Sequence, residues 1–110
     1  MIKSKKVKTN KKQFKGNDKY TLCLYIAGQT IKAITALKNL KSICKDQLKG
    51  KYHIEIIDLQ KNPKLGRDDQ ILAIPTLMRK VPLPVRIIIG DLSDTERVLA
   101  GLNLNNYIPV

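Results

Sequence analysis

Residues Tyr20–Leu59 read YTLCLYIAGQTIKAITALKNLKSICKDQLKGKYHIEIIDL, and this stretch decides the fold. It opens with Tyr20–Ile26, an almost continuous apolar and β-favouring run that is typical of a strand covered on both faces. Gly28 breaks this run, and Thr30 stands where the first residue of a helix needs a cap.

The expected helix follows Thr30, and its apolar residues recur every three or four positions, so that they share one face. These residues are Ala33, Leu37, Leu40, Cys44 and Leu48. Gly50 ends the helix, and Tyr52–Leu59 resumes a strand pattern. Two strands joined by a helical crossover of roughly 20 residues lie parallel, with a right-handed connection. The stretch therefore predicts a β-α-β unit.

The second half of the chain has shorter elements. A helix over Lys64–Ala73, with Pro63 at its start, is expected to carry its charges outward. Leu77–Val81 and Val85–Gly90 have the composition of strands. Ser93 is expected to cap a final helix, with Glu96 completing a capping box. The order is then β-α-β-α-β-β-α, which defines an α/β domain.

One segment, residues 63–92, favours no single packing. Its apolar runs are short enough to form either strand or helix, and prolines interrupt it. We interpret it as a segment able to adopt two packings, marked by Pro63, Pro75, Pro82, Pro84, Gly90 and Asp91.

The composition indicates one soluble, aliphatic-rich domain in 110 residues. Residues 20–104 form the expected domain, preceded by a Lys-rich extension at 1–19 and followed by a short tail at 105–110. No apolar run approaches the ~20 residues of a membrane span. The basic N-terminus has no apolar segment of the kind that secretion signals carry, so we expect a cytoplasmic protein without a membrane partner.

The net charge of +12 is concentrated in the extension, where eight lysines and one aspartate give +7. The other 13 basic and 8 acidic residues leave only +5 for the rest of the chain. We interpret the extension as a disordered, solvated tail that attracts polyanions without specificity. An arm dedicated to nucleic acid is the alternative, but Phe14 is its only aromatic residue, and we expect no specific nucleic-acid partner.

The sequence offers no catalytic, cofactor or metal site. The turn after the first strand holds the place where a thioredoxin-type redox enzyme carries its two cysteines, and it contains none. Cys23 and Cys44 lack metal-binding spacing and are expected to be buried. His53 is expected at the surface, and Asp68 and Asp69 on a solvated helix face.

Four stretches together resemble the KaiB family of small clock proteins, over Tyr20 to about Leu104. They are Leu24–Gly28, Ile57–Pro63, Ile71–Leu77 and, most specifically, Pro82–Asp94. The sensor domain of the histidine kinase SasA is a more distant relative. The resemblance implies a single thioredoxin-like domain with a shared β-α-β first half and a metamorphic second half. One state is ordered β-α-β-β-α-α-β and forms a tetramer; the other is the thioredoxin-like β-α-β-α-β-β-α.

The resemblance also implies partners. The thioredoxin-like state of KaiB binds the ATPase ring of KaiC and then captures KaiA. We therefore expect a non-enzymatic regulator without a cofactor that binds a KaiC-type ATPase in a clock or stress-response system, with a KaiA-like or histidine-kinase partner and a dimer or tetramer of its own. The basic residues expected to meet a partner are Lys19, Lys38, Arg79, Lys80 and Arg86.

This sequence departs from the family at three charged or rigid positions. Ile31 stands where relatives have proline, and Thr35 replaces an arginine of the first helix. Relatives have two arginines before Ile-Ile-Gly, of which Arg86 is kept and Ile87 replaces the other. Because rim charges govern the encounter of proteins, the alternative is a diverged homologue that no longer binds KaiC and acts as a thioredoxin-fold adaptor in stress adaptation. A redox enzyme and a polyanion-binding protein are the hypotheses from other classes.

The composition of the extension yields a first prediction. Deleting residues 1–17 should leave the urea midpoint of unfolding nearly unchanged, because a like-charged segment without apolar periodicity adds no burial. Denaturation of the full and shortened chains, followed by circular dichroism, measures this. A large fall in the midpoint would mean that the extension docks on the domain.

Overall fold

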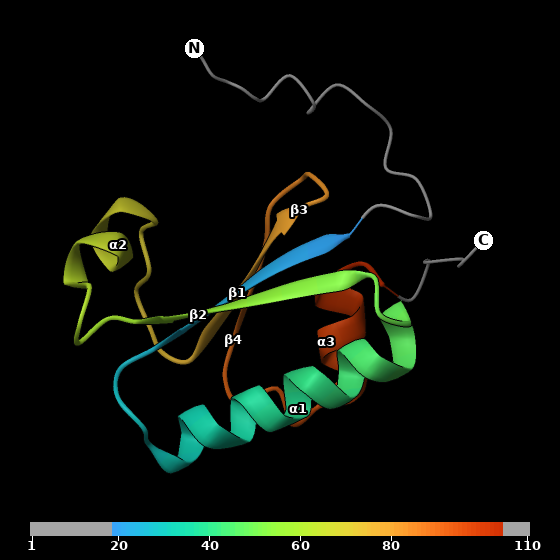
Figure 1. Cartoon of the computed structure of the whole chain (residues 1–110), viewed down its shortest axis with the longest axis horizontal. Helices are drawn as coiled ribbons and strands as arrows, with labels where there is room; N and C mark the ends of the chain where they lie inside the picture. Colours follow the sequence, from blue (N-terminus) through green and yellow to red (C-terminus); the bar gives the residue numbers. More distant parts are fainter. Residues whose placement is uncertain (1–18, 105–110) are drawn as a thin grey trace.

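The computed structural model describes residues 19–104, and its elements follow the order β-α-β-α-β-β-α (Figure 1). They are β1 (Tyr20–Ile26), α1 (Ile31–Leu48), β2 (Tyr52–Asp58), α2 (Pro63–Asp68), β3 (Thr76–Val81), β4 (Arg86–Ile89) and α3 (Thr95–Gly101). This is the order predicted by reading the sequence directly. Residues 1–18 of the extension predicted at 1–19, and the tail predicted at 105–110, lie outside the described residues.

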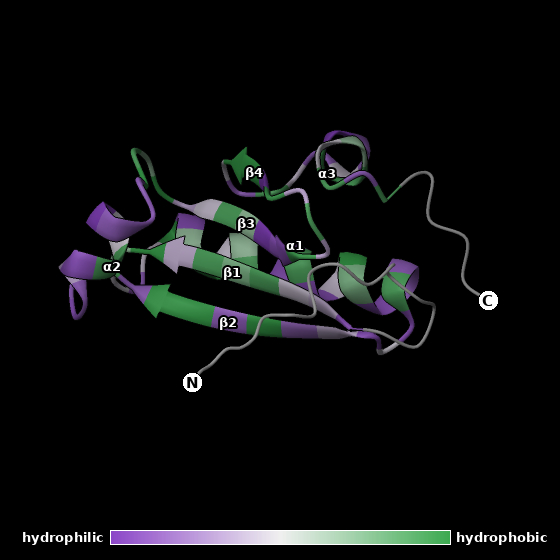
Figure 2. Ribbon diagram, turned by 90° about the horizontal axis from the view of Figure 1, so that it is seen from above, coloured by the Kyte–Doolittle hydropathy of each residue, from purple (hydrophilic) through white to green (hydrophobic). Residues whose placement is uncertain are grey.

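The strands form one sheet in the order β2-β1-β3-β4, with β1 between β2 and β3 (Figure 2). β1 and β2 are parallel, as expected, and their register runs from Tyr20 opposite Tyr52 to Ile26 opposite Asp58. β3 is antiparallel to β1, and β4 is antiparallel to β3. β1 is thus hydrogen-bonded on both sides, whereas β2 and β4 are the edges.

Helix α1 begins and ends as its sequence predicts. The Thr30 hydroxyl accepts a hydrogen bond from the Ala33 amide at 3.0 Å, which satisfies one of the free N–H groups of the first turn. Lys49 and Gly50 both have left-handed backbone angles, with φ of 51° and 84°, and they end the helix.

Alternation along β1 divides the apolar residues between two faces of the sheet. Leu22, Leu24 and Ile26 belong to the main core, which α1 and α3 close. Cys23 and Tyr25 point to the other face and form a smaller cluster with Met78. The expectation that β1 is covered on both faces is confirmed, since these five side chains are at most 5% exposed.

The predicted helix over Lys64–Ala73 is too long. α2 ends at Asp68, Gln70 turns left-handed at φ 59°, and the Ile71 amide bonds back to the Gly66 carbonyl at 2.8 Å. This is a Schellman end, which a helix pattern alone does not reveal. Leu72 is consequently 94% exposed rather than on an apolar helix face.

The predicted cap of α3 is displaced by one residue. Asp94 caps the helix, because its carboxylate accepts the Arg97 amide at 3.1 Å. The Ser93 amide instead donates to the Asp91 carboxylate at 3.0 Å and belongs to the preceding turn. Glu96 therefore lies in the first turn without forming the predicted capping box.

Ile88 is 5% exposed in the main core, and its packing yields the second prediction. A Cβ added to Gly101 of α3 would lie 2.8 Å from Ile88 Cδ1, so the two elements are in close contact. Ile88→Ala should lower the free energy of unfolding by roughly 2–5 kcal/mol, because it leaves a cavity.

Urea denaturation measures this loss, and Ile87→Ala is the matched control. Ile87 is the neighbouring residue of β4 but is 52% exposed, so its truncation should cost less than about 1 kcal/mol. Equal losses in the two variants would contradict the assignment of Ile88 to the core.

Candidate functional site

The turn between β1 and α1 is fixed by contacts to β2. Asp58 ends β2, and its Oδ1 accepts the Gly28 amide at 3.1 Å and the Gln60 amide at 2.9 Å. Gly28 has a φ of +79°, and a Cβ there would lie 3.0 Å from the Gln60 side chain. The backbone angle therefore favours glycine, whereas the flexible Gln60 side chain could move to make room for a Cβ.

An open hollow of about 410 Å³ lies beside this turn. Its apolar wall comes from the end of β1, the start of α1 and the segment before β3. The lining residues are Ile26, Ala27, Thr30, Ile31, Lys32, Ala33, Ile74 and Pro75. The carbonyl of Pro75 accepts the Gly90 amide at 2.9 Å, which ties the hollow's far side to the end of β4.

The hollow contains no thiol, because neither cysteine lines it. Cys23 and Cys44 are both free and buried, as expected. Burial raises the pKa of the Cys23 thiol to about 11, helped by its hydrogen bond to Glu55, and raises the pKa of Cys44 to about 12. Thiols with so little thiolate near neutral pH are poor nucleophiles.

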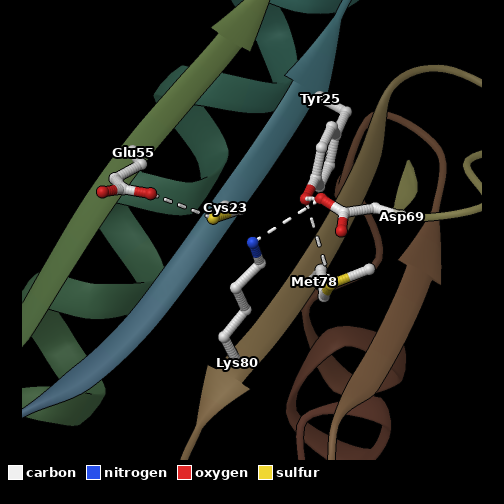
Figure 3. A network of polar contacts seen from close by, with 6 residues as sticks. All are labelled: Cys23, Tyr25, Glu55, Asp69, Met78 and Lys80. Carbon is white, nitrogen blue, oxygen red and sulfur yellow. Dashed lines mark hydrogen bonds and ion pairs between the residues drawn. The ribbon is translucent and has the colours of Figure 1, made fainter. Parts of the chain in front are cut away.

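A polar network lies on the sheet face opposite α1 (Figure 3). The Tyr25 hydroxyl donates to the Asp69 carboxylate, which also pairs with Lys80 at 3.6 Å. The same hydroxyl lies 4.0 Å from the Met78 sulfur. Burial and the Asp69 carboxylate raise the pKa of Tyr25 well above its usual range, so the hydroxyl stays protonated as a donor.

This network corrects the expectation that Asp68 and Asp69 share a solvated helix face. Asp68 does lie at the surface, paired with Lys64 at 3.1 Å. Asp69 instead turns inward to β1 and β3 after α2 has ended. Sequence reasoning missed its role, because nothing local marks which of two adjacent aspartates reaches a strand 44 residues earlier.

The five basic residues expected to meet a partner do not form one cluster. Lys19 and Arg86 are exposed at strand ends, and Lys38 is exposed on α1. Lys80 pairs with Asp69 on the sheet face opposite α1. These basic residues therefore lie on separate surfaces and do not form one basic patch.

Arg79 differs from the other four because it is only 3% exposed. Its guanidinium donates to the carbonyls of Leu102 at 2.5 Å and Pro84 at 2.8 Å. Burial lowers the pKa of Arg79. In this fold the side chain therefore joins β3 to the end of α3 and is not presented at the surface.

The residues that mark the segment expected to adopt two packings lie at the ends of helices and strands or in the turns between them. Pro63 starts α2 as expected, and Pro75 is buried beside the hollow. Pro82 and Pro84 lie in the β3–β4 turn; the peptide bonds before these two prolines and before Pro75 are cis. Gly90 follows β4 with a φ of 125°.

Asp91, the last residue of that set, holds the connection to α3. Its carboxylate accepts hydrogen bonds from Ser93, which lower the pKa of Asp91. Its carbonyl accepts the Asn39 side-chain amide at 2.9 Å, which links this connection to α1. His53 is exposed as expected, 3.7 Å from the Glu55 carboxylate.

Among residues 19–104, no three His, Cys, Asp or Glu side chains are placed to hold a metal ion together. No helix within this range is long and apolar enough to span a membrane.

Comparison with solved structures defines the class of protein. Chloroplastic thioredoxin z superposes with a TM-score of 0.63 at 16% identity, covering 80% of each chain. The N-terminal domain of Synechococcus elongatus SasA superposes with a TM-score of 0.66 at 17% identity, covering 83% of this chain and 90% of that one. The chain is therefore a thioredoxin-like domain, here with a turn that lacks cysteines.

Sequence comparison then gives the family. The KaiB domain model matches residues 23–104. The circadian clock oscillator protein KaiB of Rippkaea orientalis is 55% identical over 85 residues, which cover 77% of this chain and 82% of that protein. The KaiB of Synechococcus elongatus is 54% identical, with 77% and 83% covered. The chain belongs to the KaiB family, as its motifs indicated.

The two thiols yield the third prediction. Near about pH 8 both should react with a disulfide reagent at least about tenfold more slowly in the native protein than in guanidinium, because raised pKa values leave little thiolate and burial blocks access. The absorbance of the thiol that the reagent releases measures the two reaction rates. A native thiol reacting as fast as a free one would revive the redox hypothesis.

Proposed function

We propose that this chain is a non-enzymatic, cytoplasmic regulator that binds a KaiC-type ATPase in a circadian-clock or stress-response system. The observation that carries the proposal is membership of the KaiB family across the described domain, together with the thioredoxin-like order. The N-terminal domain of SasA has a similar fold. This similarity supports partners drawn from clock proteins, among them a KaiA-like or histidine-kinase partner.

Binding would use the exposed basic residues. Lys19, Lys38 and Arg86 present their charges to solvent, where they can steer an acidic partner. Lys80 is half-buried and shares its charge with Asp69. Arg86 lies directly opposite Arg79 in the register of β3 and β4. Arg79 would therefore contribute indirectly, by holding the two strands in the arrangement that presents Arg86.

The proposal includes a second, oligomeric state. The family resemblance implies two orders of the segment 63–92, and we propose that a dimer or tetramer in the other order predominates in the free protein. The thioredoxin-like form would then be the minor, binding-competent population. Apparent affinity falls in proportion to that competent fraction.

Two substitutions favour a second candidate function, a thioredoxin-fold adaptor that has lost KaiC binding. Thr35 and Ile87 replace arginines that relatives carry, and Ile87 is 52% exposed, so a charge is missing from the surface rather than from the core. An adaptor of this kind would act in stress adaptation through another partner.

The kinetics of binding test the proposal. If a fold change precedes binding, the observed rate with a KaiC-type ring should level off as ring concentration rises, measured by stopped-flow fluorescence. Ile87→Arg should tighten the complex without altering the ratio of oligomer to monomer, because it adds one charge at an exposed position.

Ile56→Arg on the other edge strand is the matched control, since Ile56 is 47% exposed. It should change neither affinity nor the oligomer ratio. Rapid binding proportional to concentration by a purely monomeric protein would overturn the two-state proposal. Absence of any binding to KaiC-type rings would favour the adaptor.

A further inference from the structure

Helix α1 exposes a stripe of residues spaced alternately by three and four, which places them on one side of the helix. We call it the α1 stripe: Ile31, Ile34, Lys38, Lys41 and Lys45. Its first two residues are apolar, with Ile31 84% and Ile34 55% exposed. The stripe covers about 21 Å along the helix axis at about 1.5 Å per residue.

The three lysines of the stripe carry uncompensated charge. None of them takes part in an ion pair within residues 19–104, where the pairs are His53–Glu55, Lys64–Asp68 and Lys80–Asp69. The acidic residue of α1, Asp46, follows Lys45 directly and so points about 100° away around the helix. One helix face thus combines an apolar end with a basic end.

The apolar end of the stripe meets the hollow described above. Ile31 both begins the stripe and lines the hollow. The remaining apolar wall consists of Ile26, Ala27, Ala33, Ile74 and Pro75. Ile74 is itself 44% exposed. Solvent-exposed aliphatic side chains around a concavity of about 410 Å³ leave a site that one or two aliphatic side chains of a partner would fill.

We propose that the α1 stripe and the hollow together dock an acidic amphipathic helix of a partner protein. Aliphatic side chains of that helix enter the hollow and contact Ile31 and Ile34, while its carboxylates follow Lys38, Lys41 and Lys45. A helix lying along another helix presents side chains at the same spacing of three and four, so each apolar or charged group finds its complement.

Two other occupants fit the surface less well. An anionic membrane would require a protruding apolar face, whereas here the apolar residues rim a hollow. Nucleic acid would match the lysines but would set phosphates against Ile31 and Ile34, and the stripe has no aromatic side chain on which a base stacks.

The inference deepens the proposed function, since it names the surface and the chemistry of a partner. It adds four residues, because only Lys38 of the stripe was expected from the sequence to meet a partner. The surface lies on α1, the β1–α1 turn and the segment before β3, and it includes no residue of edge strand β4, which carries Arg86.

The test uses the full chain and a synthetic helical peptide with leucines at one end and glutamates at the other, at the stripe's own spacing. Fluorescence anisotropy should show binding that weakens as salt rises from about 50 to about 300 mM. The double variant Lys41→Glu with Lys45→Glu should weaken binding about tenfold, and Ile34→Asn several-fold at either salt concentration.

The matched control is Lys61→Glu with Arg67→Glu, which makes the same change in net charge at exposed positions near α2. It should bind the peptide as the parent protein does. Circular dichroism melting of each variant separates loss of the surface from loss of the fold.

Four results would overturn the inference. The first is equal weakening in the stripe variant and its control, and the second is equal binding of a peptide with scrambled spacing. The third is tighter binding of phosphatidylserine vesicles or duplex DNA through the same lysines. Capture of a KaiC-type ATPase alike by the parent and the stripe variant would refute the stripe but leave the proposed function standing. Peptide binding through the stripe, without capture of any KaiC-type ATPase, would support the stripe and contradict the proposed function.

Discussion

The structure depends on the burial of β1 from every side. Its backbone pairs with β2 on one edge and β3 on the other, and its side chains are covered on both faces. Leu22 and Leu24 contribute to the main core, and burial of each such side chain stabilises the fold by roughly 1.5–3 kcal/mol. β3 is likewise paired on both edges, with β1 and β4, and its residues 76–79 are buried, so the register of the sheet rests on these two central strands.

The later half of the chain is attached to β1 by the backbone pairing of β3, by apolar side chains of the main core and by polar side-chain contacts. Edge strand β4 has four residues, of which Ile88 is the buried one. The Tyr25 hydroxyl holds Asp69, and Arg79 joins β3 to α3 through backbone carbonyls. Buried polar contacts of this kind give modest net stability but are expensive to break singly. The Arg79 Nε has no hydrogen-bond partner within the described residues, which reduces the gain further.

The sequence predicted the first half of the chain, β1 to β2, better than the later half. Periodicity and caps predicted β1, α1 and β2 with their parallel pairing, because each signal is local and repeated. The end of α2 and the cap of α3 were missed, since Gln70 and Asp91 decide them through single backbone turns. Burial of Arg79 could not be predicted, because its acceptors are carbonyls that any residue supplies. The partner-binding residues stay predictions.

The chemistry of the hollow supports the proposal that this thioredoxin-like domain binds a partner. Its polar lining residues are Thr30 and Lys32. The Thr30 hydroxyl is engaged in capping α1, and Lys32 is exposed at the rim, so neither is placed as an activated nucleophile. The cysteines are buried elsewhere with raised pKa values. The end of β1 thus presents an apolar concavity beside the positive charge of Lys32, a combination that suits the proposed binding of a partner.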